Sequence, residues 1–207
     1  LSALYGSFKA LAATRVTQVV AYAGVGCFSA LWWSFAATGV FSYHSIAYGS
    51  SASLLIAALL LGWQRAQRLC GDLTLDRMHG LARPMPRFAT IMSLLIMAAA
   101  GLPPFGFFSS YLAILLQPAA VVSWELVVML CAWFFASWYL FRMMQRLLFG
   151  PHRTDIHYED LRGHEVAGFA VLLLALALLT AAPIESFEPQ TFFNSSRIAM
   201  GIMSWFK

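Results

Sequence analysis

The sequence predicts an all-α protein, a polytopic transmembrane bundle of about five to six spanning helices. Of its 207 residues, 60% are hydrophobic and only 11% are charged, and the mean hydropathy is +0.72, whereas about a quarter of the residues of a soluble domain are charged. Five segments also reach the length of about 20 apolar residues that a helix needs to cross a bilayer. Together these observations predict an integral membrane protein.

The predicted elements follow one another between short polar connectors. The opening stretch, Leu1–Ala13, is expected to be the end of an earlier helix, and the absence of an initial Met or a signal-peptide pattern suggests a piece of a longer chain. The apolar spans are Val16–Phe41, His44–Trp63, Phe88–Leu116, Val121–Phe141 and Val166–Ala182. We expect residues 1–183 to form the transmembrane unit. Residues 184–207 would form a C-terminal tail, either an amphipathic helix at the interface or a frayed end.

The basic residues predict the orientation of the bundle. Nine of the 13 Lys and Arg residues lie in two connectors, Arg65–Arg87 and Arg142–Glu165. By the positive-inside rule, these connectors face the cytoplasm or its equivalent, and Arg142 and Arg146 would anchor the inner end of their helix. The net charge of +4 therefore reflects the orientation of the protein in the membrane, and it gives no support to nucleic-acid binding.

The third span, Phe88–Leu116, is interrupted at its centre by Gly101, Pro103, Pro104 and Gly106, which all disfavour a continuous helix. Its length also exceeds what one upright span needs. Two half-helices joined at "GLPPFG" account for both observations. Irregular backbone at membrane depth is tolerated where it packs in protein or lines a wet cavity, and it marks ion sites in transporters. A proline kink that only improves packing is the alternative.

Four side chains near the spans are candidates for a proton path, because ionisable groups inside a membrane are costly and often functional. His44 opens the second span, and Tyr48 lies one turn deeper on the same face. Lys9 lies in an apolar helix, where its ammonium group either relays protons or reaches to the interface. Glu125 lies in the first turn of its span, where an acid is favoured, so anchoring or a subunit contact competes with proton transfer.

The sequence contains no catalytic nucleophile motif and no metal-ligand pattern of known spacing. Histidines and acids do gather in one connector, but we expect a solvated loop there rather than a metal site, because their spacing fits no ligand set. These residues are His152, Asp155, His157, Glu159, Asp160, His164 and Glu165. The three cysteines, Cys27, Cys70 and Cys131, are expected to be free thiols.

Several motifs, in the same order, resemble the antiporter-like membrane subunits of respiratory complex I, a group related to multisubunit cation/proton antiporters and membrane-bound hydrogenases. The segment "GLPPFGFFSSYLAIL" is similar to the "GLPxxxGFxx" signature of the family's broken helix, and "GLARPMPRFATIMSLLIMAAAGLPP" to the region before it. The segment "LYGSFKALAATRVTQVVAYAGVG" is similar to "YGxxxALxQxDxKRxxAYSSxSHxG". The resemblance covers nearly the whole chain and fits the chain type lettered M best, with L second.

The resemblance implies an inverted-repeat unit of five helices with one discontinuous helix, followed by one more helix. It also implies a mid-membrane line of lysine, histidine and glutamate side chains that pass protons, with quinone and redox centres in other subunits. Much of that line is replaced here, at Thr17, Gly26, Cys27, Tyr48, Ala52 and Ser110 or Tyr111. At the positions of this line, His44 is the one residue that is titratable as in the family, and it matches only the pattern of the L-type chain. We expect Lys9 to replace part of the missing lysine function.

Three functions from different classes remain. The first is a membrane-arm subunit of a complex I-like NADH/quinone oxidoreductase, in proton translocation or its structural support, with pumping by this half altered or lost. The second is a transporter subunit of a multisubunit cation/proton antiporter or an energy-coupled bicarbonate uptake system, and the third is a non-conducting assembly scaffold. In each case we expect other membrane subunits and the lipid bilayer as partners, a bacterial or mitochondrial inner membrane, and no cofactor or redox site in this chain.

Overall fold

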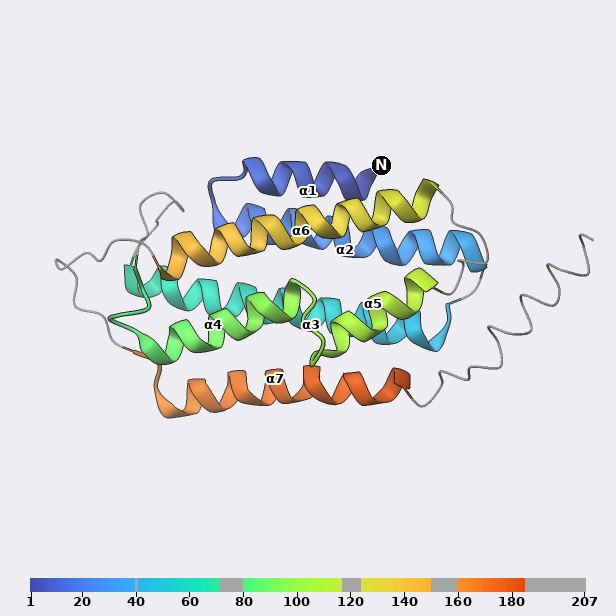
Figure 1. The fold of residues 1–207 in the computed structure, drawn as a ribbon. Helices are drawn as coiled ribbons and strands as arrows, with labels where there is room; N and C mark the ends of the chain where they lie inside the picture. Colours follow the sequence, from blue (N-terminus) through green and yellow to red (C-terminus); the bar gives the residue numbers. More distant parts are fainter. Residues whose placement is uncertain (40, 71–79, 117–123, 150–159, 185–207) are drawn as a thin grey trace, which may run out of the picture.

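A computed structural model describes residues 1–39, 41–70, 80–116, 124–149 and 160–184, and these described residues form a helical bundle (Figure 1). The predicted tail therefore lies almost wholly outside the described residues. The helices are α1 Ser2–Ala12, α2 Val16–Thr38, α3 Tyr43–Cys70, α4 Pro86–Ala99, α5 Gly106–Leu116, α6 Trp124–Leu148 and α7 Gly163–Ile184.

The lengths of the helices fit a membrane protein with one broken span. Within the described residues, α2, α3 and α6 are each long and apolar enough to cross a bilayer alone. The helices α4 and α5, of 14 and 11 residues, are each too short to do so. They follow one another along the bundle with the break between them (Figure 1), so together they make one crossing.

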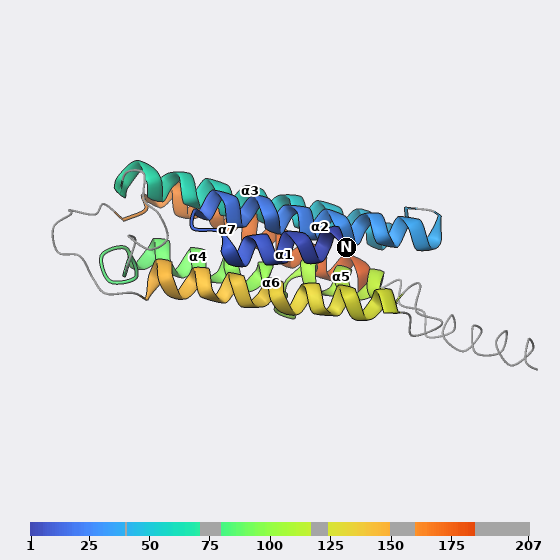
Figure 2. The same ribbon diagram turned by 90° about the horizontal axis from the view of Figure 1, so that it is seen from above.

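The helices pack as a bundle around a core that runs through its centre. The short helix α1 lies against α2 and α6, while α3 contacts both half-helices of the broken span. Helix α7 covers α3 and α5 on the opposite side of the bundle from α1 (Figures 1 and 2). The broken span is thus enclosed by α3, α6 and α7, and its backbone is shielded from lipid on these sides.

The end of the bundle at which α3 and α6 finish is tied together by polar contacts between elements far apart in sequence. Arg65 of α3 forms an ion pair with Glu165 of α7, with 3.1 Å between Nε and Oε1. The backbone N–H groups of Leu81 and Ala82 donate to the carbonyl groups of Leu147 and Leu148 at the end of α6. These bonds satisfy carbonyl groups that a helix end otherwise leaves without partners.

Two helices continue beyond the apolar spans expected from the sequence, and both continuations contain arginines. Helix α3 continues past Trp63 to Cys70, and α6 continues past Phe141 to Leu148. The apolar runs end at these points, but the residues beyond them are good helix formers, and Ala66, Met143 and Leu147 are buried. Hydropathy marks where a span leaves the membrane, whereas packing decides where the helix ends.

Candidate functional site

The candidate site begins at the break, where α4 ends in a Schellman motif. Gly101 has a φ of 88°, and its N–H donates to the Ala98 carbonyl while the N–H of Leu102 donates to the Met97 carbonyl, both at 3.2 Å. This pair of bonds with a left-handed residue is the Schellman pattern. A Cβ at Gly101 would lie 2.9 Å from Nε1 of Trp133. Both the backbone angle and the neighbouring ring therefore require glycine at this position.

Helix α6 supplies donors for the carbonyl group that the break leaves free. The Ala100 carbonyl accepts hydrogen bonds from Nε1 of Trp133 and from Oγ of Ser137, each at 3.3 Å. The predicted pair of half-helices joined at Gly101–Gly106 is confirmed, because the irregular turn separates α4 from α5 instead of bending one helix. This freed carbonyl is thus satisfied inside the protein, as membrane depth requires.

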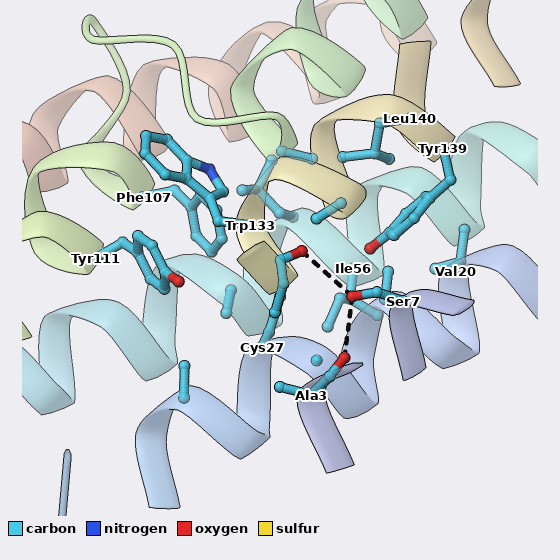
Figure 3. A pocket seen from close by; sticks show the side chains of 18 of the residues that line it. Ala3, Ser7, Val20, Cys27, Ile56, Phe107, Tyr111, Trp133, Tyr139 and Leu140 are labelled. Atoms are coloured by element: carbon cyan, nitrogen blue, oxygen red, sulfur yellow. Dashed lines mark hydrogen bonds between the residues drawn. The ribbon is translucent and has the colours of Figure 1, made fainter. Parts of the chain in front are cut away.

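A central cavity of about 60 Å³ lies beside the break. Its walls come from α1, α2, α3, α5 and α6, together with Ala99 at the end of α4 (Figure 3). Such a volume has room for several water molecules where polar groups face it. The cavity therefore lies where the broken span meets the helices that surround it.

Aromatic rings form the wall of this cavity next to the break. Tyr48 of α3 stacks on Phe107 of α5 with ring centroids 5.3 Å apart, and it lies 5.6 Å from Tyr111. Tyr111 in turn lies 5.5 Å from Trp133 of α6. Ring pairs at these separations stabilise the contact beyond the burial of apolar area. They fix α5 between α3 and α6.

Apart from the indole N–H of Trp133, the polar side-chain groups that line the cavity are hydroxyls and one thiol. Ser7 of α1 donates toward the carbonyls of Ala3, at 2.9 Å, and Ala132, at 3.3 Å (Figure 3). Tyr139 of α6 directs its hydroxyl into the cavity (Figure 3), and Cys27 of α2 lines it. No Lys, Arg, His, Asp or Glu is found among the described residues that line it. The cavity can thus order water, but its lining exchanges few protons near neutral pH.

The structure brings only Tyr48 of the four proton-path candidates into the cavity. Tyr48 is buried and donates to the Cys27 carbonyl at 3.2 Å. His44 is half-buried at the start of α3, and its Nδ1 has no hydrogen-bond partner among the described residues. Its role in a proton path stays a prediction.

Glu125 and Lys9 lie on the surface of this chain. Glu125 accepts a hydrogen bond of 2.9 Å from Nε1 of Trp33 and so links the start of α6 to α2. Lys9 is exposed on α1, with Nζ 5.9 Å from the centroid of the Tyr5 ring. The structure does not bring Lys9 beside His44 or Tyr48, and its predicted role as a partial replacement for a lysine has no support from these contacts.

Several residues of the site were not predicted from the sequence. Ser7, Trp133, Ser137 and Tyr139 lie in apolar runs where nothing distinguishes them from residues that face lipid. The one usable signal is on α1, where the small residues Ala3, Ser7 and Ala10 recur at helical spacing and are all buried. Such a stripe predicts a close helix contact. The partners across that contact depend on tertiary structure.

Two acids of the histidine-rich connector are helix caps. Asp160 accepts hydrogen bonds from the N–H groups of Arg87, at 3.1 Å, and Phe88, at 3.2 Å, in the first turn of α4. Glu165 accepts from the Arg162 N–H at 3.0 Å, at the start of α7. Caps of this kind satisfy N–H groups that have no partner within the helix. Residues 150–159 of the connector lie outside the described part of the chain.

Replacing Asp160 by alanine is expected to lower the free energy of unfolding by about 1 to 2 kcal/mol, because the cap of α4 is lost. Asparagine at the same position keeps a side-chain acceptor and should lower it less. Hydrogen exchange at the amides of Arg87 and Phe88 would measure the effect, with the exposed neighbour His164→Ala as control. Equal protection of these amides in all three variants would contradict the capping role.

Comparisons with known proteins show which family and which relatives have a similar sequence. The sequence profile of the family described as "NADH:quinone oxidoreductase/Mrp antiporter, TM" matches residues 1–139. NADH-quinone oxidoreductase subunit M of Escherichia coli (strain K12) is 27% identical over 98% of this chain and 40% of the relative. Subunit L of the Campylobacter jejuni oxidoreductase is 28% identical over 93% of this chain and 31% of the relative.

A solved structure has the same helical arrangement. A chain of respiratory complex I from Thermus thermophilus with bound NADH superposes with a TM-score of 0.79 at 27% identity, over 88% of this chain and 39% of that chain. The protein thus spans well under half the length of the relatives that it matches. Because the family profile covers about two thirds of the chain and the helices fit a bilayer, the chain is an integral membrane protein of the NADH:quinone oxidoreductase/Mrp antiporter family.

Proposed function

We propose that the chain is part of a membrane-arm subunit of a complex I-like NADH/quinone oxidoreductase, and that its broken-helix unit supports proton translocation without itself carrying protons. The observation that carries this proposal is the cavity at the break, whose described lining holds hydroxyls and a thiol but no charged side chain. The family likeness supports membership of such a complex. The chain itself holds no cofactor in this proposal, and redox centres belong to other subunits.

The supporting role follows from the chemistry of the side chains that line the cavity. A relay across a membrane needs side chains that gain and lose protons near neutral pH, such as lysine, histidine or glutamate. Tyr111 donates its hydroxyl to the Met129 carbonyl at 3.1 Å, and Tyr48 donates to Cys27. Both hydroxyls are therefore used to join helices. The unit keeps its architecture through these bonds.

Isolation of the full-length protein from its native membranes tests membership of the complex. A tag on the protein should recover NADH-dependent quinone reduction together with other membrane subunits. Recovery of cation/proton exchange without NADH oxidation would instead support the second candidate, an antiporter subunit, which the family description also names. Recovery of neither activity would leave the scaffold role and overturn the proposal.

Removal of the cavity hydroxyls tests the supporting role. The triple variant Tyr48→Phe, Tyr111→Phe and Tyr139→Phe should leave the ratio of protons moved to electrons transferred unchanged, because no proton passes through these groups. Acidification of membrane vesicles alongside NADH oxidation gives this ratio, and the single variant Tyr5→Phe at an exposed position is the matched control. A lower ratio in the triple variant, at unchanged NADH oxidation, would show that protons use this cavity.

A further inference from the structure

Among the described residues that line the central cavity, one hydroxyl group has no hydrogen-bond partner in the protein. It belongs to Tyr139 of α6, a residue that is only 5% exposed. The hydroxyl is directed into the cavity (Figure 3). A buried hydroxyl without a partner costs free energy, which a bonded atom of a ligand would recover. The group therefore points to a molecule that binds in the cavity.

The other strong donors of the described lining are already used within the protein. Each donates to a backbone carbonyl group, and these side chains are Ser7, Tyr48, Tyr111 and Trp133. The thiol of Cys27 also lines the cavity, but a thiol is a weak donor. Tyr139 is thus the strong donor in this lining that remains available to a bound molecule.

The lining on the same side of the cavity as Tyr139 is largely apolar. Leu140 follows Tyr139 in the chain, and Val20 of α2 is drawn on that side (Figure 3). A buried water molecule makes about three hydrogen bonds, and few of these are available beside Tyr139. A water molecule there is weakly held, so an apolar group that displaces it gains affinity. The cavity thus favours an occupant that is mostly hydrocarbon.

The size and charge of the cavity restrict the occupant further. Small side chains of α6, Ala132 and Ala136, line the cavity one turn apart and leave room next to Tyr139. The volume of about 60 Å³ is well below that of an engineered apolar cavity of about 150 Å³ that binds benzene. A charged occupant is disfavoured, because the described lining offers no counter-charge. The occupant is therefore neutral and smaller than a benzene ring.

We propose that the central cavity binds a short-chain aliphatic alcohol of the size of n-propanol. The oxygen atom of the alcohol accepts a hydrogen bond from the Tyr139 hydroxyl, and its alkyl chain lies against Ala132 and Ala136. Binding is weak, in the millimolar range, because so few atoms make contact. The proposal rests on the cavity and not on the NADH/quinone activity. Its failure would leave the result of the co-purification experiment unchanged.

Photolabelling of the full-length protein in its native membranes tests the site. The probe is a diazirine derivative of n-propanol, whose light-activated carbene inserts into neighbouring bonds. Mass spectrometry should find the label on Tyr139 or Cys27, and n-propanol at about ten times its Kd should lower this label about tenfold by mass action. Label on Val171, which is 65% exposed on α7, should not be displaced. A cavity without label, or a label that n-propanol does not displace, would overturn the proposal.

Filling the cavity is a second test of the site. Ala136→Leu places a larger side chain in the space of the alcohol and should lower the label on Tyr139 about tenfold. Ala170→Leu, at an exposed position of α7, is the matched control and should leave the label unchanged. Equal labelling of both variants, at similar unfolding midpoints, would contradict the site. Displacement by n-propanol needs no substitution, so it decides the proposal even if Ala136→Leu does not fold.

Tyr139→Phe tests the hydrogen bond to the alcohol. The Kd of n-propanol, measured by displacement of the label, should rise about fivefold because one hydrogen bond is lost. A diazirine derivative of n-butane, in which a methyl group replaces the hydroxyl, should label the cavity of Tyr139→Phe and of the original protein equally. Tyr5→Phe, at an exposed position of α1, should change neither result. An unchanged Kd in Tyr139→Phe, or an equal loss for both compounds, would contradict the hydrogen bond.

Discussion

Replacing Gly101 by alanine is expected to lower the free energy of unfolding by about 2 to 3 kcal/mol. The residue has a φ of 88°, which L side chains rarely adopt, and the new Cβ would lie 2.9 Å from Trp133. Trp133 would have to move, and its hydrogen bond to the Ala100 carbonyl would be lost. The measurement is the thermal unfolding midpoint of the full-length protein in mild detergent.

The matched control is Gly168→Ala. Gly168 lies on the exposed side of α7, and a Cβ there meets no atom within 4 Å. This substitution should leave the midpoint unchanged or raise it slightly, because alanine is the better helix former. A Gly101→Ala protein as stable as the Gly168→Ala protein would show that α4 does not need its left-handed end.

The second large effect is expected at Gly6, where α1 lies close to the backbone of α2. A Cβ at Gly6 would lie 2.9 Å from the backbone carbonyl oxygen of Tyr22. Gly6→Leu should therefore force α1 away from α2 and lower the stability by about 2 kcal/mol or more. The hydrogen bond from Ser7 to the Ala132 carbonyl depends on the same position of α1.

Protease sensitivity near residue 13, together with the unfolding midpoint, would detect the displaced α1. Gly26→Ala is the control on the facing helix, since its Cβ meets no atom within 4 Å. We expect this variant to behave like the original protein. If Gly6→Leu were as stable as Gly26→Ala, the close contact between α1 and α2 would not exist in the membrane.

The sequence predicted the helical class and the broken span because the signals for both are local. Apolar runs of sufficient length indicate segments that lie in the bilayer. A break in the helix is indicated within a few residues by Gly101, Pro103, Pro104 and Gly106. Contacts between distant segments leave no such trace. The bond from Trp133 to Ala100 and the cap from Asp160 to α4 depend on helices that meet only in the folded bundle.

The residues of the candidate site were likewise predicted only in part. Tyr48 was predicted from its position one helical turn after His44, and the structure places it in the cavity. Tyr139 was missed because its neighbours, Trp138 and Phe141, are equally aromatic but exposed. Only the rotation of α6 against α1 and α2 decides which of these rings turns inward. A periodic pattern is weak there, since lipid and protein both accept apolar side chains.

The cap on α4 has a consequence for how the protein is made. Asp160 lies 73 residues after Arg87, the first residue whose N–H it accepts. During synthesis, α4 therefore emerges long before the carboxylate that caps it, and neither α4 nor α5 can span the bilayer alone. The broken span has to enter the membrane as one segment, with its first turn uncapped until the chain has passed α6. Translation past residue 160 is thus the earliest point at which this span can become fully bonded.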